Sequence, residues 1–308
     1  MRGNWKSLLG GAAVASLLIL PAIAADSGWV VWPSRSYNAN SLKIDDIVGT
    51  VIVRVTGGPM TVDVSGAKER VNGLKVGVEG GVLKIDGSEA SENQAVWNWR
   101  DWFNFPNYVD HRTDNLTIKI SVPRGTNIDV DDLVGDANIG DTQGALRFEA
   151  AASKATIGRV ASANISLGGS GKLDLAAVTG DLKLEVGGSG KVTVGPTGSV
   201  KADIAGSGTG VFGPIAGGLH LSIAGSGDVT AARVNGPVHI DIAGSGSVKI
   251  ADGTADPLHV DIMGAGNFAF GGVAVDPHID AVGSGSVKLK SYRGHLDSEG
   301  MADVKIGD

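Results

Sequence analysis

Apolar and polar residues alternate along seven short segments in the second half of the chain. A period of two places the apolar side chains on one face of an extended strand and the polar side chains on the other. We therefore predict seven short strands, each with one buried and one exposed face. Their apolar pairs are Ile165/Leu167, Leu184/Val186, Ala202/Ile204, Leu221/Ile223, Ile240/Ile242, Val260/Ile262 and Ile279/Ala281.

A glycine-rich tripeptide follows each of these segments at an almost constant interval of 18 to 20 residues. A fixed period of about this length indicates one structural unit stacked on copies of itself. Alternation resumes after the tripeptide, and a unit ends at a Gly-Pro, Asp-Pro or similar corner. We predict an all-β fold, a parallel β-helix with coils of about 19 residues and tight glycine turns. The central residues of the tripeptides are Ser170, Ser189, Ser207, Ser226, Ser245, Ala265 and Ser284.

The first half of the chain repeats this pattern less regularly. Alternating segments occur at 51–55, 60–64, 74–78, 82–85 and 116–122, with glycine pairs at 57–58 and 80–81. We interpret residues 25–160 as an irregular N-terminal β region, made of earlier coils or of a β-sandwich-like cap on the same stack. Residues 161–308 form the regular repeat region.

A segment rich in aromatic residues, 88–114, interrupts the pattern. Clustered Trp and Tyr side chains can stack on sugar rings or anchor a protein partner. They can equally pack on the flank of the helix or, together with Trp29 and Trp32, seal its open end. The candidate partner-binding residues are Trp97, Trp99, Trp102, Phe103, Phe105 and Tyr108.

The first 24 residues have the pattern of an export signal. Arg2 and Lys6 precede an apolar run at 8–20, and Ala22-Ile23-Ala24 is typical of a cleavage site. We expect an exported chain, periplasmic, cell-surface or secreted, with no transmembrane segment after cleavage. The sequence contains no cysteine, so neither a disulfide nor a lipid-modified cysteine contributes.

The charge balance restricts the partners. Without the signal, 24 basic and 33 acidic residues give a formal charge of −9. Nucleic acids and anionic lipids require clustered cations, so we expect neither as a partner. The expected partner is a surface, a glycan or an envelope protein.

Histidines recur at one position of the repeat. His220, His239, His259, His278 and His295 occupy this position if the last unit is aligned on Gly300-Met301-Ala302. Stacked coils should bring neighbouring imidazoles about 5 Å apart. Four aspartates follow these histidines by two residues, Asp241, Asp261, Asp280 and Asp297.

This grid of side chains has three interpretations. It is a solvated ladder copied with the repeat, a zinc or copper site, or a face that changes charge near pH ~6. If the histidines form only a solvated ladder, we expect no bound metal and no cofactor. The candidate ligands, if a metal binds, are His239, Asp241, His259, Asp261, His278 and Asp280.

Catalysis is the weaker alternative. The acidic column Glu185, Asp203, Asp241, Asp261 and Asp280 could serve a polysaccharide-active β-helix enzyme. Short, uniform turns, however, build no groove that excludes water or orients a substrate. No helical pattern follows Gly-Ser-Gly, so it is not a nucleophile elbow. We expect no catalytic residues.

The repeats resemble a known family. Ala-Gly-Ser-Gly-Asp-Val at 224–229 and Ala-Gly-Ser-Gly-Ser-Val at 243–248 are similar to repeats of the GIN-domain family, the head domain of autotransporter adhesins. The resemblance is good over 161–308, weaker over 41–87 and absent in the aromatic segment. It implies a β-helical cell-envelope protein with an adhesive role and no assigned catalytic residues. We therefore predict a non-enzymatic, adhesin-like binding scaffold.

Overall fold

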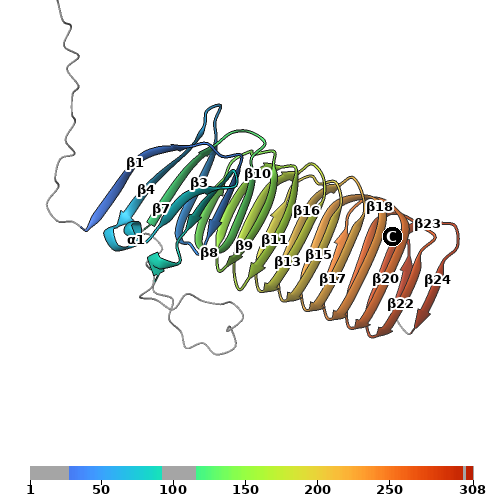
Figure 1. Cartoon of the computed structure of the whole chain (residues 1–308). Helices are drawn as coiled ribbons and strands as arrows, with labels where there is room; N and C mark the ends of the chain where they lie inside the picture. Colours follow the sequence, from blue (N-terminus) through green and yellow to red (C-terminus); the bar gives the residue numbers. More distant parts are fainter. Residues whose placement is uncertain (1–27, 92–115, 301–302, 308) are drawn as a thin grey trace, which may run out of the picture.

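The structure is a computed structural model that describes residues 28–91, 116–300 and 303–307. Within these residues the chain is a β-solenoid of about nine turns, with coils about 19 residues apart (Figure 1). The predicted parallel β-helix is thus confirmed. The export signal and the aromatic candidates at 97–108 lie outside the described residues. No helix in the described ranges is both long and apolar enough to span a bilayer.

The N-terminal region combines strands with two short helices. Its elements are β1 (Trp29–Tyr37), β2 (Ser41–Asp45), β3 (Val48–Val55), β4 (Met60–Ala67), α1 (Lys68–Asn72), β5 (Lys75–Glu79), β6 (Val82–Asp86), a 3₁₀ helix (Glu89–Ser91), β7 (Leu116–Val122), β8 (Asn127–Ile139), β9 (Ala145–Ala151) and β10 (Lys154–Val160).

The regular region contains only strands. These are β11 (Ser162–Gly168), β12 (Lys172–Val178), β13 (Leu182–Gly188), β14 (Lys191–Val194), β15 (Val200–Gly206), β16 (Thr209–Ile215), β17 (Leu219–Gly225), β18 (Asp228–Gly244), β19 (Ser247–Ile250), β20 (Gly253–Gly264), β21 (Asn267–Val275), β22 (His278–Gly283), β23 (Ser286–Arg293), β24 (Asp297–Gly300) and β25 (Asp303–Ile306).

Each regular coil contributes one strand to each of two long parallel sheets, and a third, shorter parallel ladder joins successive coils, as at Val234↔Gly253 and Thr254↔Val273. The first sheet runs from β6 through β2, β8, β9, β11, β13, β15, β17, β18, β20 and β22 to β24. The second sheet runs from β7 through β3, β8, β10, β12, β14, β16, β18, β19, β21 and β23 to β25. The long strands β8 and β18 belong to both sheets.

Antiparallel strands cover the N-terminal end of the stack (Figure 1). β4 pairs antiparallel with β7, and β1 pairs antiparallel with β4. β5 likewise pairs antiparallel with β6. The N-terminal region therefore combines early coils of the stack with antiparallel strands at its end.

The core lies between the two sheets as one continuous cluster, which extends from Leu42 to Leu289. Every apolar pair predicted to face inward is buried, from Ile165/Leu167 to Ile279/Ala281. Burial of each strand requires the coils above and below it, because a single coil has no second apolar layer of its own. The inward-facing side chains are therefore buried only because the coils are stacked.

The glycine-rich corners lie in a file along the solenoid. The amide of Ser226 donates to the carbonyl of Gly206 over 2.8 Å, and that of Ser245 donates to Gly225 over 2.8 Å. Gly225 has a φ of +128°, and a Cβ atom there would lie 2.5 Å from the carbonyl oxygen of Gly206. Only glycine combines this backbone conformation with so close an approach of the neighbouring coil.

Candidate functional site

The outer face of the first sheet carries two parallel rows of polar side chains, which we call the charged face. The His/Lys row occupies one register position of successive strands, and the carboxylate row lies two residues further along each strand. The His/Lys row comprises Lys84, Lys43, Asp129, Arg147, Asn164, Lys183, Lys201, His220, His239, His259, His278 and Asp297. The carboxylate row comprises Asp86, Asp45, Asp131, Glu149, Ser166, Glu185, Asp203, Ser222, Asp241, Asp261, Asp280 and Glu299, with a bulge of β8 between Asp131 and Glu149.

The sequence creates these rows through the strand period. Two outward residues flank one buried residue, as Lys183 and Glu185 flank the fully buried Leu184. Register then carries the pattern from coil to coil, because paired strands of a parallel sheet lie about 4.8 Å apart. The pair Lys183–Glu185 closes as an ion pair of 2.7 Å.

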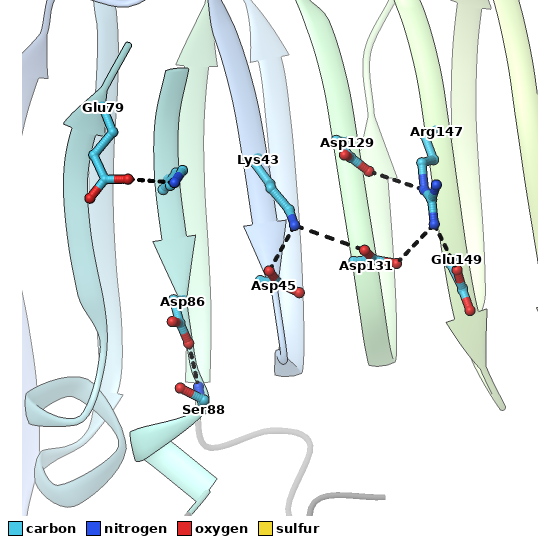
Figure 2. Close-up of polar contacts among 10 residues, drawn as sticks. Lys43, Asp45, Glu79, Asp86, Ser88, Asp129, Asp131, Arg147 and Glu149 are labelled. Carbon is cyan, nitrogen blue, oxygen red and sulfur yellow. Dashed lines mark hydrogen bonds and ion pairs between the residues drawn. The ribbon is translucent and has the colours of Figure 1, made fainter. Parts of the chain in front are cut away.

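Permanent cations occupy most positions of the His/Lys row in the N-terminal half of the charged face. Lys43 Nζ lies 2.9 Å from Asp45 Oδ2 and 3.9 Å from Asp131 Oδ2. Arg147 Nη2 lies 3.6 Å from Asp131 Oδ1, so Asp131 joins the two cations (Figure 2). The hydrogen bond to Asp45 raises the pKa of the Lys43 ammonium.

Arg147 extends this network to two further carboxylates (Figure 2). Its Nη2 atom lies 3.2 Å from Glu149 Oε2, and its Nε atom lies 3.5 Å from Asp129 Oδ1. Partial burial raises the pKa of Asp129, and the attraction of Arg147 only partly opposes this effect. Partial burial and the neighbouring Asp131 raise the pKa of Glu149. The network therefore holds more negative charge than its two cations compensate.

An open groove follows this half of the charged face. Its lining is more apolar than polar, with Leu42, Val82, Ile128 and Leu146 beside the polar and charged side chains of Ser41, Lys43, Asn127, Asp129, Arg147, Asn164, Asp181 and Lys183. The polar groups can donate and accept hydrogen bonds along the solenoid axis. The groove is open to solvent along its length, so it suits an extended partner rather than an enclosed small molecule.

Histidines replace the permanent cations in the C-terminal half. The rings of His220, His239, His259 and His278 stack with centroids 4.8, 4.8 and 4.7 Å apart and interplanar angles of 7°, 15° and 14°. The expected spacing of about 5 Å thus agrees with the structure. Two of these histidines lie beside carboxylates of the next row: His239 Nε2 is 3.2 Å from Asp241 Oδ2, and His259 Nε2 is 3.1 Å from Asp261 Oδ2.

The prediction that His295 continues this ladder is wrong. His278 pairs in register with Asp297, and its Nδ1 atom lies 3.0 Å from Asp297 Oδ2. His295 precedes the row by two residues, and its backbone amide donates to Asp276 Oδ1 over 2.9 Å. Alignment on Gly300-Met301-Ala302 assumed a short last coil, whereas the coil that leads to Asp297 keeps the usual length.

Asp297 therefore lies in the His/Lys row and not, as expected, in the carboxylate row. Glu299 takes that place and pairs with Asp280. Four of the candidate metal ligands, His239, Asp241, His259 and Asp261, lie close to one another, and His220 lies beside them. Asp280 contacts no histidine nitrogen at ion-pair distance in the described chain.

Sequence reasoning missed the N-terminal continuation of the charged face. A signal for it exists: Lys43-Ile44-Asp45 and Lys84-Ile85-Asp86 have the cation-apolar-carboxylate order of His239-Ile240-Asp241. The long strand β8 interrupts the period at this point, since it belongs to both sheets. The rows thus continue where the repeat itself is no longer regular.

The tryptophans proposed to seal the end of the helix lie in β1. Trp32 packs against the core, and the guanidinium of Arg35 lies 5.0 Å from the centroid of its ring. Trp29 is 49% exposed. β1 pairs with the antiparallel strand β4 at the N-terminal end of the stack, and Trp32 packs against the core there.

Several solved structures resemble this chain. A putative adhesin from Parabacteroides distasonis shares 17% identity, with 91% of this chain and 98% of that chain covered and a TM-score of 0.43. A putative adhesin from Parabacteroides merdae shares 14% identity, with 92% and 98% covered and a TM-score of 0.43. A putative lipid binding protein from P. distasonis shares 14% identity, with 92% and 98% covered and a TM-score of 0.37. No curated protein matches the chain.

A family profile matches residues 46–212, which is more than half of the chain. The matched residues include the N-terminal coils and the first regular coils. The match thus begins well before residue 161, where the regular repeats start. Membership indicates an adhesin-like, exported protein. The chain belongs to the family described as "Putative auto-transporter adhesin, head GIN domain".

Proposed function

We propose that the protein is a non-enzymatic binding scaffold of the cell envelope, which contacts a surface, a glycan or a protein partner through the charged face. One observation carries this proposal: two rows of polar side chains follow the first sheet from β6 to β24, in register except at a bulge in β8. The adhesin-like family supports a role in contact rather than in turnover.

The chemistry of the charged face favours an extended, polar partner. Most of its cations are already paired with carboxylates of the protein, as in Lys43–Asp45 and Lys183–Glu185. A polyanion would have to displace these internal partners. A glycan can instead hydrogen-bond to both rows at once, because hydroxyl groups donate and accept. Among the three partner classes, a glycan fits the open groove best.

An exposed apolar strip supports contact with a large partner. It borders the carboxylate row, and it includes Ala243, Met263 and Val282 in paired strands. Met263 is 67% exposed and Val282 is 59% exposed. Apolar side chains gathered in this way are typical of contact surfaces.

A polysaccharide-active enzyme is the second candidate, since the carboxylate row brings acidic residues into neighbouring coils. Hydrolysis by two carboxylates requires a defined separation and a substrate held between them. The groove along the N-terminal half of the charged face is open to solvent and does not enclose a substrate. Release of shortened oligosaccharides would favour this alternative.

The binding test compares two charge reversals made in the same coils on different sheets. Lys183→Glu/Lys201→Glu alters adjacent strands of the charged face, and Lys172→Glu/Lys191→Glu alters adjacent strands of the second sheet. All four side chains are exposed. We expect the first variant to lose at least about tenfold in affinity on a glycan array or on immobilised cell envelopes, because charge complementarity sets partner choice.

The control variant should bind within about twofold of the wild type. Equal loss in both variants, or in neither, would contradict the role of the charged face. The aromatic candidates remain a second predicted contact. Trp97→Ala/Trp99→Ala/Trp102→Ala should weaken binding and leave the melting temperature unchanged, and a lowered melting temperature with intact binding would assign them a structural role.

A further inference from the structure

We propose that the histidine ladder binds a divalent transition-metal ion, zinc or copper, independently of the partner-binding role of the charged face. The ligands are His239 and a carboxylate with one neighbouring histidine. Two overlapping sets meet this description: His220, His239 and Asp241, and His239, His259 and Asp261. In each set the ligand atoms all lie within 4.8 Å of one another.

The distance between nitrogen and oxygen already suits a metal ion. His239 Nε2 lies 3.2 Å from Asp241 Oδ2, and His259 Nε2 lies 3.1 Å from Asp261 Oδ2. Tetrahedral ligands about 2.0–2.1 Å from zinc lie about 3.3 Å apart. The separation of the two atoms therefore matches that of two ligands of one ion.

The third ligand requires one ring to turn. The stacked imidazoles are nearly parallel, and a nitrogen lone pair lies in the plane of its ring, so neighbouring lone pairs do not converge. The torsion that turns a histidine ring has a broad, soft profile. His239 and His259 are each 37% exposed, which leaves space for this rotation.

The surrounding charges favour a cation. Between His220 and Asp280 the two rows contain histidines, aspartates and one serine, and the nearest lysine of these rows is Lys201 in the preceding coil. Asp241 and Asp261 thus face no permanent cation from either row. In the N-terminal half, Lys183 and Glu185 occupy the same two positions. The charged lysine has no free lone pair and cannot bind a metal ion.

The donor set predicts which ions bind. Two imidazoles and one carboxylate suit zinc, copper and related ions, and three protein ligands leave at least one coordination position for water. Magnesium and calcium prefer oxygen ligands and should not compete. Because both sets use His239, we expect one ion per chain.

The test titrates Zn²⁺ into the untagged, chelator-treated mature chain by calorimetry. The wild type should bind one ion per chain in the presence of excess Mg²⁺. His239→Ala removes a ligand from both sets and should weaken Kd by at least about tenfold. His278→Ala is the matched control: it removes a stacked ring that belongs to neither set, and Kd should change by less than about threefold.

Asp241→Asn/Asp261→Asn provides a second variant that keeps side-chain shape, and it should also weaken Kd by at least about tenfold. Circular dichroism checks that each variant is folded. In the wild type, electron paramagnetic resonance of bound Cu²⁺ should show coupling to imidazole nitrogens. The assignment is overturned if the wild type shows no saturable binding, or if His239→Ala and His278→Ala give the same curve.

Discussion

Single glycines set how closely the coils approach. At Gly225 the carbonyl of Gly206 occupies the space that a side chain would need, and the φ of +128° is unfavourable for any other residue. Equivalent glycines recur in the neighbouring coils, as at Gly206 and Gly264. The repetition of the tripeptide is therefore a consequence of stacking geometry and does not itself indicate a chemical role for its serine.

Gly225→Ala should lower the free energy of unfolding by about 1–3 kcal/mol, because the new Cβ strains the backbone and meets the adjacent coil. Denaturant titration followed by circular dichroism measures the change. Gly57→Ala is the control, since Gly57 has no positive φ and no atom within 4 Å of the added Cβ. It should change stability by less than about 0.5 kcal/mol. Equal effects at both positions would refute the close-approach explanation.

Single carboxylates of the charged face differ in how they respond to pH. Burial raises the pKa of Asp129, so the folded chain holds this proton more tightly than the unfolded chain. The resulting stability is present below the ordinary pKa of 3.8 and is lost as pH rises through the folded value. The hydrogen bond from Lys172 lowers the pKa of Asp174, so its contribution is present at neutral pH and is lost in acid.

Asp129→Asn and Asp174→Asn should therefore change thermal stability in opposite directions. At neutral pH the first variant should melt slightly above the wild type, and the second slightly below it. Both differences should shrink toward about pH 3, where the wild-type carboxyls take up protons. Melting curves across this range measure the effect; the same sign for both variants would mean that Arg147 outweighs the burial of Asp129.

At the scale of elements, the N-terminal end of the stack is built from antiparallel strands, unlike the parallel coils that follow it. Parallel pairing leaves a free strand edge at the end of a sheet, and free edges promote association. β4 pairs antiparallel with the edge of β7, β1 pairs antiparallel with β4, and β5 pairs antiparallel with β6. Trp32 of β1 adds a partly buried side chain to the core at this end.

Deletion of residues 28–37 should expose the outer edge of β4 and increase self-association relative to the wild type. Light scattering after size-exclusion chromatography measures this change over a range of concentrations. Val31→Ser is the control, because Val31 is 67% exposed and its substitution keeps the β1–β4 pairing. If the deletion leaves both association and melting temperature unchanged, β1 is not a cap.

Sequence predicted these elements unevenly for a physical reason. Period-two alternation identifies a strand with one buried face, and it does so equally for parallel and antiparallel strands. Strands at 60–64 and 74–78 were therefore anticipated, but the antiparallel orientation of β4 and β5 was not. Only a fixed repeat distance signals parallel stacking, and the N-terminal region has none.

At the scale of the whole molecule, the register joins distant residues into the charged face. The sequence predicted the histidine ladder because its four members recur every 19 or 20 residues. It placed His295 wrongly because the tripeptide is lost in the last coil and no longer fixes the alignment. It missed Lys43 because the long strand β8 separates it from the regular repeat, and it missed Arg147 because β9 precedes the first Gly-Ser-Gly tripeptide.

Both the binding surface and the metal site require continuous rows, so the register itself is the claim to test. Ser166, Ser222 and Glu299 belong to the carboxylate row; three coils separate the first two, and four coils separate the last two. The chain has no cysteine, so nitroxide labels can be attached at introduced pairs without background.

Pulsed electron paramagnetic resonance on Ser222→Cys/Glu299→Cys and Ser166→Cys/Glu299→Cys measures the distances most directly. At about 4.8 Å per coil we predict about 19 Å and about 34 Å, although 77 and 133 residues separate the labels along the chain. Narrow distributions at these values would confirm that the rows are continuous. Broad distributions, or a second distance that does not exceed the first by about three coils, would contradict the stacked register and with it the charged face.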